Sequence, residues 1–452
     1  MPGSSWPLWL GLCLALPILG APLLPGAAEI GDLTGPPSTH RLLRLAVPGG
    51  APRWLIATPP RLPRERAQGL LVLTAEGKFH APRLGAESIR APLRWERNPI
   101  PSDLTAEVPP ADLGGGRLGG PGRDGFFVIV NTVAREWRFV RPSEPLSALS
   151  RPAALSRTAA AAVGEDGSLL LFRESGSGWR EAHRLAPGSP GLPSPVLKDA
   201  LLAAADLDGD GNLELVAPAA PTDRRRHGVL GDAVEPTELR IFRLEGDRLR
   251  PMGRYAAGAG AVFEALGALA ADIDGDGREE IPVTRSDARG TAHLLLGLEK
   301  GELRVKARGA SAGSRWSHVL GAFDVDHSGI KVLAVEAPHM AGSLLALRIH
   351  QGDLRERARR PGFTTHAAGS RNMWQFALLR RGGFVEVVLQ ERGRKRLAAL
   401  ALVGNRWKLR WTLDLTSPAA SNIVAGDFDG DGRDDLALAD AAGNLLLLLS
   451  RG

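Results

Sequence analysis

Cysteine is almost absent from this 452-residue chain, which contains only Cys13. A single thiol cannot form an intramolecular disulfide, and a cysteine-based structural zinc site is not expected either. The ten histidines are scattered without the paired spacing of zinc enzymes. Any cross-linking of the fold must therefore come from another kind of bond.

Long apolar runs are also lacking outside the N-terminal segment. The apolar stretch of residues 6–19 is too short and too interrupted by proline for a transmembrane helix. Small residues at Gly26 and Ala28 favour a signal peptide over residues 1–28, although no basic residue precedes the apolar stretch. Cys13 follows Leu12, which does not suit a lipoprotein cut. We therefore expect an exported mature chain, residues 29–452, that is periplasmic or secreted and has no membrane span.

Excess charge of one sign is small. The 56 Lys and Arg residues against 50 Asp and Glu give a net charge of +6, and the two signs are interleaved along the chain. This pattern does not favour a nucleic-acid partner. Dense basic clusters occur at Arg224, Arg225 and Arg226, and at residues 392–396. The first lies in an insertion, residues 220–238, that is the best candidate recognition loop for an anionic partner.

What the chain does have is a repeat with short apolar runs and many turn residues, including 55 glycines and 34 prolines. The acidic stretch that begins at Asp427 recurs at Asp206, Asp272 and Asp324, with spacings of 66, 52 and 103 residues. The last spacing leaves room for a copy without carboxylates at residues 373–390. Repeats of this length built from short strands predict a β-propeller of four-stranded blades.

The number of repeats was counted from two features of each unit. Eight first strands are expected near residues 54, 104, 158, 203, 269, 321, 374 and 423. Seven outer strands are expected at the bulky residues Phe79, Trp137, Trp179, Leu249, Leu303, Leu354 and Trp407. We therefore predict one all-β domain with eight blades, with seven as the alternative, in which residues 41–47 supply the missing outer strand and close the ring. The repeat is clearest over residues 203–452.

Three of the acidic loops have the chemistry of calcium sites. Carboxylates at positions 1, 3, 5 and 9 would repel one another unless a hard cation lay between them, and calcium suits a flexible cage of oxygens. Position 7 would contribute a backbone carbonyl. The predicted ligands are Asp206, Asp208, Asp210, Asn212 and Glu214; Asp272, Asp274, Asp276, Arg278 and Glu280; and Asp427, Asp429, Asp431, Arg433 and Asp435. The loop at Asp324 has Ser328 and Val332 at positions 5 and 9 and is expected to be empty.

These loops, with the strands that flank them, resemble the FG-GAP or VCBS-type repeats of integrin α-subunit propellers and of many exported bacterial proteins. The resemblance implies that the loops join the first two strands of a blade and bind about three structural calcium ions on one rim.

Three functions are compatible with this sequence. A non-enzymatic binding or adhesion module for a protein or glycan is favoured because no nucleophile, base and orienting group can be assigned. A polysaccharide lyase would need a basic and aromatic cluster at the mouth of the central channel. The third alternative is a periplasmic scaffold subunit.

Overall fold

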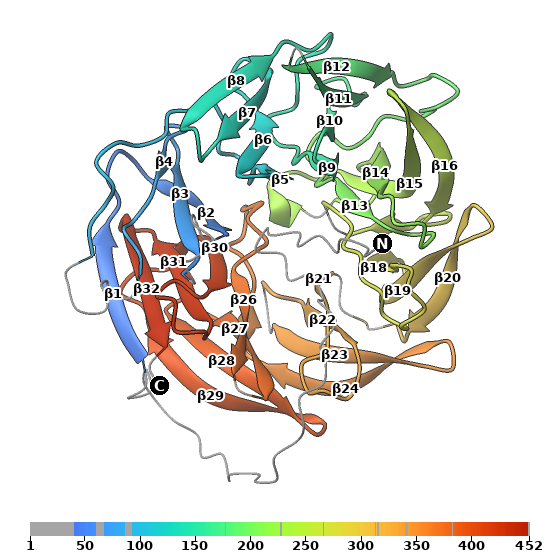
Figure 1. Ribbon diagram of the computed structural model, residues 1–452. Coiled ribbons are helices and arrows are strands. Elements are labelled where there is room, and N and C mark those ends of the chain that lie inside the picture. The colour runs from blue at the N-terminus through green and yellow to red at the C-terminus, as the bar shows by residue number, and fades with distance from the viewer. Residues whose placement is uncertain are drawn as a thin grey trace, which may run out of the picture.

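The computed structural model describes residues 40–59, 67–85, 93–176, 178–226, 228–264, 266–311, 313, 316–339, 342–381 and 383–450. The predicted signal peptide, including Gly26 and Ala28, lies outside these residues. Within them the chain is built from antiparallel β-sheets that follow one another around a ring (Figure 1). The helical segment η2 (Gly228–Leu230) is a single 3₁₀ turn.

The sheets are made of consecutive strands. The first half of the chain contains β2 (Pro52–Thr58), β3 (Gly69–Thr74) and β4 (Phe79–His80); β5 (Ala111–Gly114), β6 (Arg117–Pro121), β7 (Phe127–Asn131) and β8 (Glu136–Val140); β9 (Ala153–Ser156), β10 (Ala159–Val163), β11 (Leu169–Ser175) and β12 (Gly178–Leu185); and β13 (Ala203–Ala205), β14 (Glu214–Thr222), β15 (Glu235–Glu245) and β16 (Arg248–Ala256).

The second half continues this pattern. It contains β17 (Val262–Phe263), β18 (Ile281–Asp287), β19 (Gly290–Glu299) and β20 (Glu302–Gly309); β21 (Ser317–Phe323), β22 (Lys331–Glu336), β23 (Ser343–His350) and β24 (Asp353–Pro361); β25 (Phe363–Thr364), β26 (Phe376–Arg381), β27 (Phe384–Glu391), β28 (Arg396–Val403) and β29 (Arg406–Asp414); and β30 (Ala419–Gly426), β31 (Asp435–Asp440) and β32 (Asn444–Ser450). The runs β17–β20 and β21–β24 touch through a parallel pairing of β20 with β24 that has two residue pairs.

The ring is closed by β1 (His40–Ala46), which pairs antiparallel with β32 from His40↔Ser450 to Ala46↔Asn444. It lies beside the last three strands although it precedes them by almost the whole described chain (Figure 1). The pairing is the one that the sequence predicts for residues 41–47. Because β1 covers β32, the outer edge of β32 is not left unpaired.

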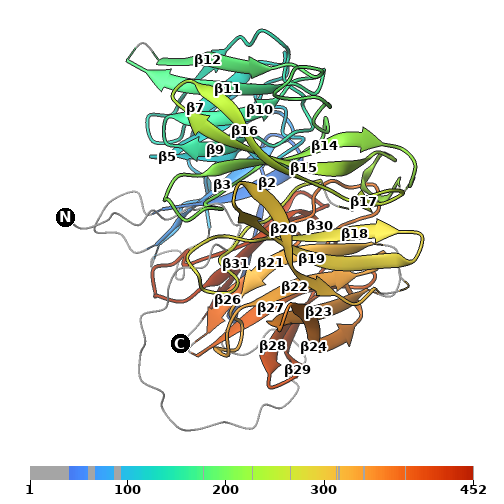
Figure 2. The ribbon, with the colours of Figure 1, turned by 90° about the vertical axis from the view of Figure 1, so that its right-hand side faces the viewer.

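The core lies between neighbouring sheets. Leu171 of β11 packs in one buried cluster with Phe242 of β15, and Leu333 of β22 packs in another with Val387 of β27. Figure 2 shows β11, β15 and β19 of successive sheets following one another around the ring. Middle strands such as β19 are apolar and buried nearly throughout, because a sheet covered on both faces needs no polar side.

The outer strands lie at the predicted positions, but several inner strands do not. The seven bulky residues all lie on outer strands, from Phe79 on β4 to Trp407 on β29. No strand is present near residue 104 among the described residues, where Leu104 makes only an isolated bridge to Gly122. The strand starts at Ala111, since Pro109 and Pro110 have no N–H to donate to a ladder.

Two further strand positions were wrong. The segment at residues 158–163 is the second strand of its sheet, β10, and follows the short first strand β9. The run near residue 269 is irregular: β17 precedes it, and Ala271 forms an isolated bridge with Glu280. Trp137 is 36% exposed on the edge strand β8, whereas Phe127 of β7 and Phe172 of β11 are buried together between their sheets.

Candidate metal centres

The three acidic loops lie at equivalent places in their sheets. Residues 206–213 connect β13 to β14, residues 427–434 connect β30 to β31, and residues 272–280 lead into β18. Each loop turns through two glycines with positive φ, at positions 4 and 6, such as Gly209 (77°) and Gly211 (83°). Only glycine adopts this conformation without a steric cost, so the DxDGDG spacing dictates the turn.

The backbone of the three loops is held by the same hydrogen bonds. The position 1 carboxylate accepts both glycine N–H groups: from Gly209 and Gly211 to Asp206 (2.8 and 2.9 Å), from Gly275 and Gly277 to Asp272 (2.7 and 3.0 Å), and from Gly430 and Gly432 to Asp427 (2.6 and 2.9 Å). The position 9 carboxylate accepts the N–H of position 2: from Leu207 to Glu214 (3.0 Å), from Ile273 to Glu280 (2.9 Å) and from Phe428 to Asp435 (2.9 Å). The loops are therefore copies in geometry as well as in sequence.

The hydrogen bonds gather carboxylate oxygens in each loop. Within each of three triplets, one oxygen per residue lies within 4.8 Å of the others: Asp206, Asp208 and Asp210; Asp272, Asp274 and Asp276; and Asp427, Asp429 and Asp435. Oxygens bound 2.3–2.6 Å from one calcium ion are at most about 5 Å apart, so the spacing fits that ion. The third triplet uses position 9 in place of Asp431, which is exposed.

In the loop at Asp427, unlike the other acidic loops, no ion pair joins a carboxylate of Asp427, Asp429 or Asp435 to a lysine or arginine among the described residues. Asp429 is 3% exposed, and its Oδ2 has no hydrogen-bond partner among the described residues. Asp435 is fully buried, and burial raises its pKa to about 7, with repulsion from Asp429 and Asp431 adding to the effect. A buried carboxylate of this kind is costly unless a cation compensates it, so these residues are the ones of the three loops that could best hold a metal ion.

Arginine and lysine side chains already reach the other two loops. Arg243 of β15 pairs with Asp208 and lies 3.8 Å from Glu214 Oε1. Lys306 of β20 places its Nζ 2.8 Å from Asp274, 3.2 Å from Asp276 and 2.6 Å from Glu280. A calcium ion would compete with these ammonium and guanidinium groups, and the competition is stronger at the Lys306 loop.

The degenerate loop at Asp324 contains its own cation. Lys331, at position 8, is 2% exposed, and its ammonium group donates to Asp326, to Ser328 Oγ (2.9 Å) and to the carbonyl of Gly329 (2.5 Å). Asp324 Oδ1 lies 3.8 Å from the same nitrogen. The lysine thus occupies the centre of the turn, in keeping with the expectation that this loop holds no calcium.

Neighbouring loops of this rim are bonded to one another. Both backbone polar groups of Asp206 are bound by Glu279 of the next sheet: the N–H donates to Glu279 Oε2 (2.7 Å), and the carbonyl accepts the Glu279 N–H (2.9 Å). Gln68 binds Asp427 in the same two ways, at 3.0 and 2.6 Å. Neither residue could be found from the sequence, because each acts on a loop far away in the chain.

The position 7 residues Asn212, Arg278 and Arg433 are exposed, and each donates its N–H to the position 5 carboxylate at 2.8–2.9 Å. Their carbonyls stay the expected ligands. The glutamates at position 9, Glu214 and Glu280, are buried. Burial raises the pKa of Glu214 to about 7, and it also raises the pKa of Glu280 despite the hydrogen bond from Lys306.

The insertion at residues 220–238 lies across one end of the ring rather than projecting from it. Its ends belong to β14 and β15, and Leu230 of η2 is buried with Trp316 and Met373. Arg371 ties it down by ion pairs to Asp232 (2.9 Å) and to Asp199 (3.1 Å).

Its three arginines are only partly available to a partner. Arg224 is exposed, whereas Arg225 donates to the carbonyl of Gly260 (2.7 Å) and Arg226 pairs with Asp223 (2.8 Å).

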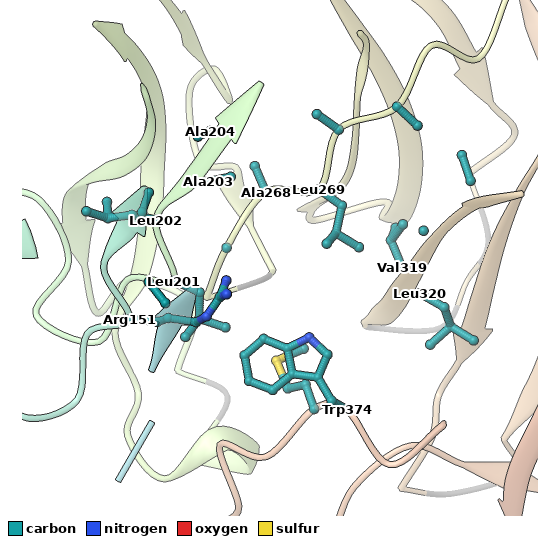
Figure 3. Close-up of a pocket in the computed structure, with 18 of the residues that line it drawn as sticks. Arg151, Leu201, Leu202, Ala203, Ala204, Ala268, Leu269, Val319, Leu320 and Trp374 are labelled. Carbon is teal, nitrogen blue, oxygen red and sulfur yellow. The ribbon is translucent and has the colours of Figure 1, made fainter. Parts of the chain in front are cut away.

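The ring axis holds a cavity of about 160 Å³. Its wall comes from the innermost segments of six successive sheets and consists mainly of alanine, leucine, valine and methionine. Asp112, Arg151 and His318 are the titratable side chains in this lining. Figure 3 shows Arg151 and the aromatic side chain of Trp374 at the cavity.

No family model matches this chain, and no curated protein matches its sequence. Solved structures similar to this chain include the following two. The first is the Dos1 propeller, with a TM-score of 0.56 and 10% identity over 90% of this chain and 94% of the other. The second is BamB from Moraxella catarrhalis, with a TM-score of 0.47 and 11% identity over 93% and 98%. The first likeness and the ring of sheets show that the fold is a β-propeller.

A search of the described residues for helices found none that is long and apolar enough to cross a membrane.

Proposed function

We propose that this chain is an exported, eight-bladed β-propeller of the FG-GAP or VCBS type that is stabilised by calcium. Its proposed role is to bind a protein or a glycan without catalysing a reaction. Eight blades correspond to counting β17–β20 and β21–β24 separately and letting β1 complete the sheet of β30, β31 and β32. The loops would hold the ions on one rim, each between the first two strands of its blade.

The observation that carries the calcium proposal is the loop at Asp427. It combines three converging carboxylates, a buried oxygen of Asp429 that has no partner among the described residues, and a buried Asp435. Asp427, Asp429 and Asp435 would hold the ion, together with the carbonyl of Arg433. The bound ion would supply the positive charge that the loop lacks. The loop at Asp206 is the second candidate, and the loop at Asp272 is the weakest because Lys306 lies in it.

The test is thermal unfolding after chelation and after calcium is restored. A ligand at 100 times its Kd stabilises a folded protein by about 2.7 kcal/mol per site, so calcium should raise the melting temperature clearly. Asp429→Asn should remove most of that increase. Asp326→Asn is the matched control, because it alters the loop that contains Lys331: it should lower the baseline stability but leave the calcium-dependent increase intact. Equal melting with and without chelator would reject the structural role of calcium.

Binding without catalysis is proposed because the hydroxyl–imidazole pair of Ser317 and His293 (2.9 Å) is buried, and burial lowers the pKa of His293 to about 4, which makes it a weak base. The rim also offers rigid loops for contact. The polysaccharide lyase is less well supported. Such an enzyme needs polar and aromatic groups for a sugar chain, whereas the axial cavity is mostly aliphatic, and Arg151 and His318 are the basic side chains in its described wall. Release of unsaturated ends from an acidic polysaccharide would overturn the non-enzyme proposal. A glycan array and capture of partners from envelope extracts would separate glycan binding from a scaffold role in the periplasm.

A further inference from the structure

The axial cavity has a mixed lining that suits a particular kind of small molecule. Leu269, Val319 and Leu320 form one side of it, and Arg151 and Trp374 face the same opening from the other side (Figure 3). The indole of Trp374 packs edge-to-face against Trp54, with 5.7 Å between the ring centroids and 76° between the ring planes. The cavity thus offers a flat aromatic surface, an aliphatic surface and one cation.

Arg151 is the group that needs a partner. Its main chain is fixed by hydrogen bonds with the carbonyl of Ala200 and the N–H of Leu202, both at 3.1 Å, so its side chain emerges at the wall of the cavity. The side chain is 8% exposed, and its Nε is buried without a hydrogen-bond partner in the part of the chain that the structure describes. No ion pair within 4.0 Å joins it to any described carboxylate, which leaves a buried guanidinium without direct compensation.

Asp112 is the nearest acidic group in the lining, but it is engaged elsewhere. Its Oδ1 accepts the N–H of Gly114 at 2.7 Å. Burial raises the pKa of Asp112, while the charge of Arg151 acts in the opposite direction. Burial also lowers the pKa of Arg151, to about 10, so the guanidinium remains charged at neutral pH. Asp112 therefore moderates the field of Arg151 without occupying its hydrogen-bonding groups.

We propose that the axial cavity binds a small monocarboxylate with an apolar body, with the carboxylate on Arg151 and the body against Trp374 and Leu269. A guanidinium binds a carboxylate through charge-assisted hydrogen bonds, and a cavity of about 150 Å³ lined by apolar groups accommodates benzene. The volume of about 160 Å³ thus corresponds to a single ring or a short alkyl chain.

Other anions fit less well. The hydroxyl groups of an acidic sugar would lose water in exchange for alanine, leucine and valine side chains, and an unpaired hydroxyl costs several kcal/mol in an apolar site. A doubly charged phosphate would need a second positive charge in the cavity. Besides Arg151, the only other basic side chain among the described lining residues is His318. Burial lowers the pKa of His318 to about 3, so it is neutral at pH 7.

Calorimetry with matched ligands tests the proposal. Benzoate should bind the full-length protein at least ten times more tightly than benzyl alcohol, which has a similar shape and no charge. Arg151→Gln should reduce the affinity for benzoate at least tenfold and leave that for benzyl alcohol within about threefold. Arg138→Gln is the control, because Arg138 has an exposed side chain on the outer strand β8. It should change neither affinity.

The position of the site is tested by filling the cavity. Leu269→Phe should abolish binding of both ligands while the melting temperature stays close to that of the unaltered protein. Should Arg151→Gln fail to fold, the comparison of benzoate with benzyl alcohol and the effect of Leu269→Phe still decide the question. Equal affinity for the two ligands, no binding of benzoate at millimolar concentration, or binding that survives Leu269→Phe would each overturn the proposal.

Discussion

Replacing Lys331 by methionine should destabilise the propeller without touching any proposed metal ligand. The ammonium group of this 2% exposed lysine is bonded to Asp326 and lies near Asp324. Loss of one partner of a buried ion pair costs 3–5 kcal/mol. The carboxylates keep some contact with water, at 11% and 28% exposure, so the lower end of about 3 kcal/mol applies. For roughly 400 residues this corresponds to a fall of about 3–4 °C in melting temperature.

The assay is urea unfolding followed by tryptophan fluorescence, with Lys408→Met as the control. Lys408 is exposed on β29, so its replacement should change stability by less than about 0.5 kcal/mol. The double variant Lys331→Met, Asp326→Asn should recover part of the loss, because both charges of the pair are then gone. A loss below about 1 kcal/mol, or a double variant whose effect equals the sum of the single effects, would refute the role of Lys331 as an internal cation.

Two further predictions concern the closure of the ring and the effect of pH. Deletion of residues 29–48 removes β1 and uncovers β32, so soluble expression should be lost, whereas a truncated protein that melts normally would contradict closure by β1. Acidification should oppose the fold at two buried histidines, because burial lowers the pKa of His318 to about 3 and that of His293 to about 4. The raised pKa values of Asp435 and Glu214, about 7 each, act in the opposite direction. Below about pH 6.5 these histidines bind protons in the unfolded chain but stay neutral in the folded chain. Each of them should therefore lower the free energy of unfolding by about 2 kcal/mol at pH 5. The test compares the change in urea midpoint between pH 7 and pH 5 in the unaltered protein and in His293→Gln. The change should be less unfavourable in the variant, and an equal change in both proteins would speak against a neutral buried His293.

The sequence predicted those parts of the molecule that repeat locally. The acidic loops, the outer strands from Phe79 to Trp407 and the closing strand depend on spacing and on apolar patterning, which a single sequence displays. The positions of the inner strands were harder to predict, because an irregular segment such as the one around Pro109 and Pro110 has no pattern that marks where strand pairing begins.

Contacts between distant residues could not be predicted. Lys331 looked like an ordinary strand residue, and its place inside the loop follows only from the turn around it. Glu279 and Gln68 bind loops of neighbouring sheets, 73 and 359 residues away from their partners. The guanidinium of Arg151, which has no ion pair among the described residues, lies where six sheets converge on the axis. None of these features leaves a periodic trace in the sequence.

The pairing of β1 with β32 also imposes an order of events on the synthesis of the protein. His40 meets Ser450 in the finished sheet, so β1 is made hundreds of residues before its partner. At about 5–20 residues per second, β1 waits roughly 20–80 s until β32 has been translated. During that time each earlier sheet can form from strands that are consecutive in the sequence, but the ring stays open because β1 lacks its partner strand β32. Folding of this propeller is therefore completed after translation has reached β32, however early the other sheets appear.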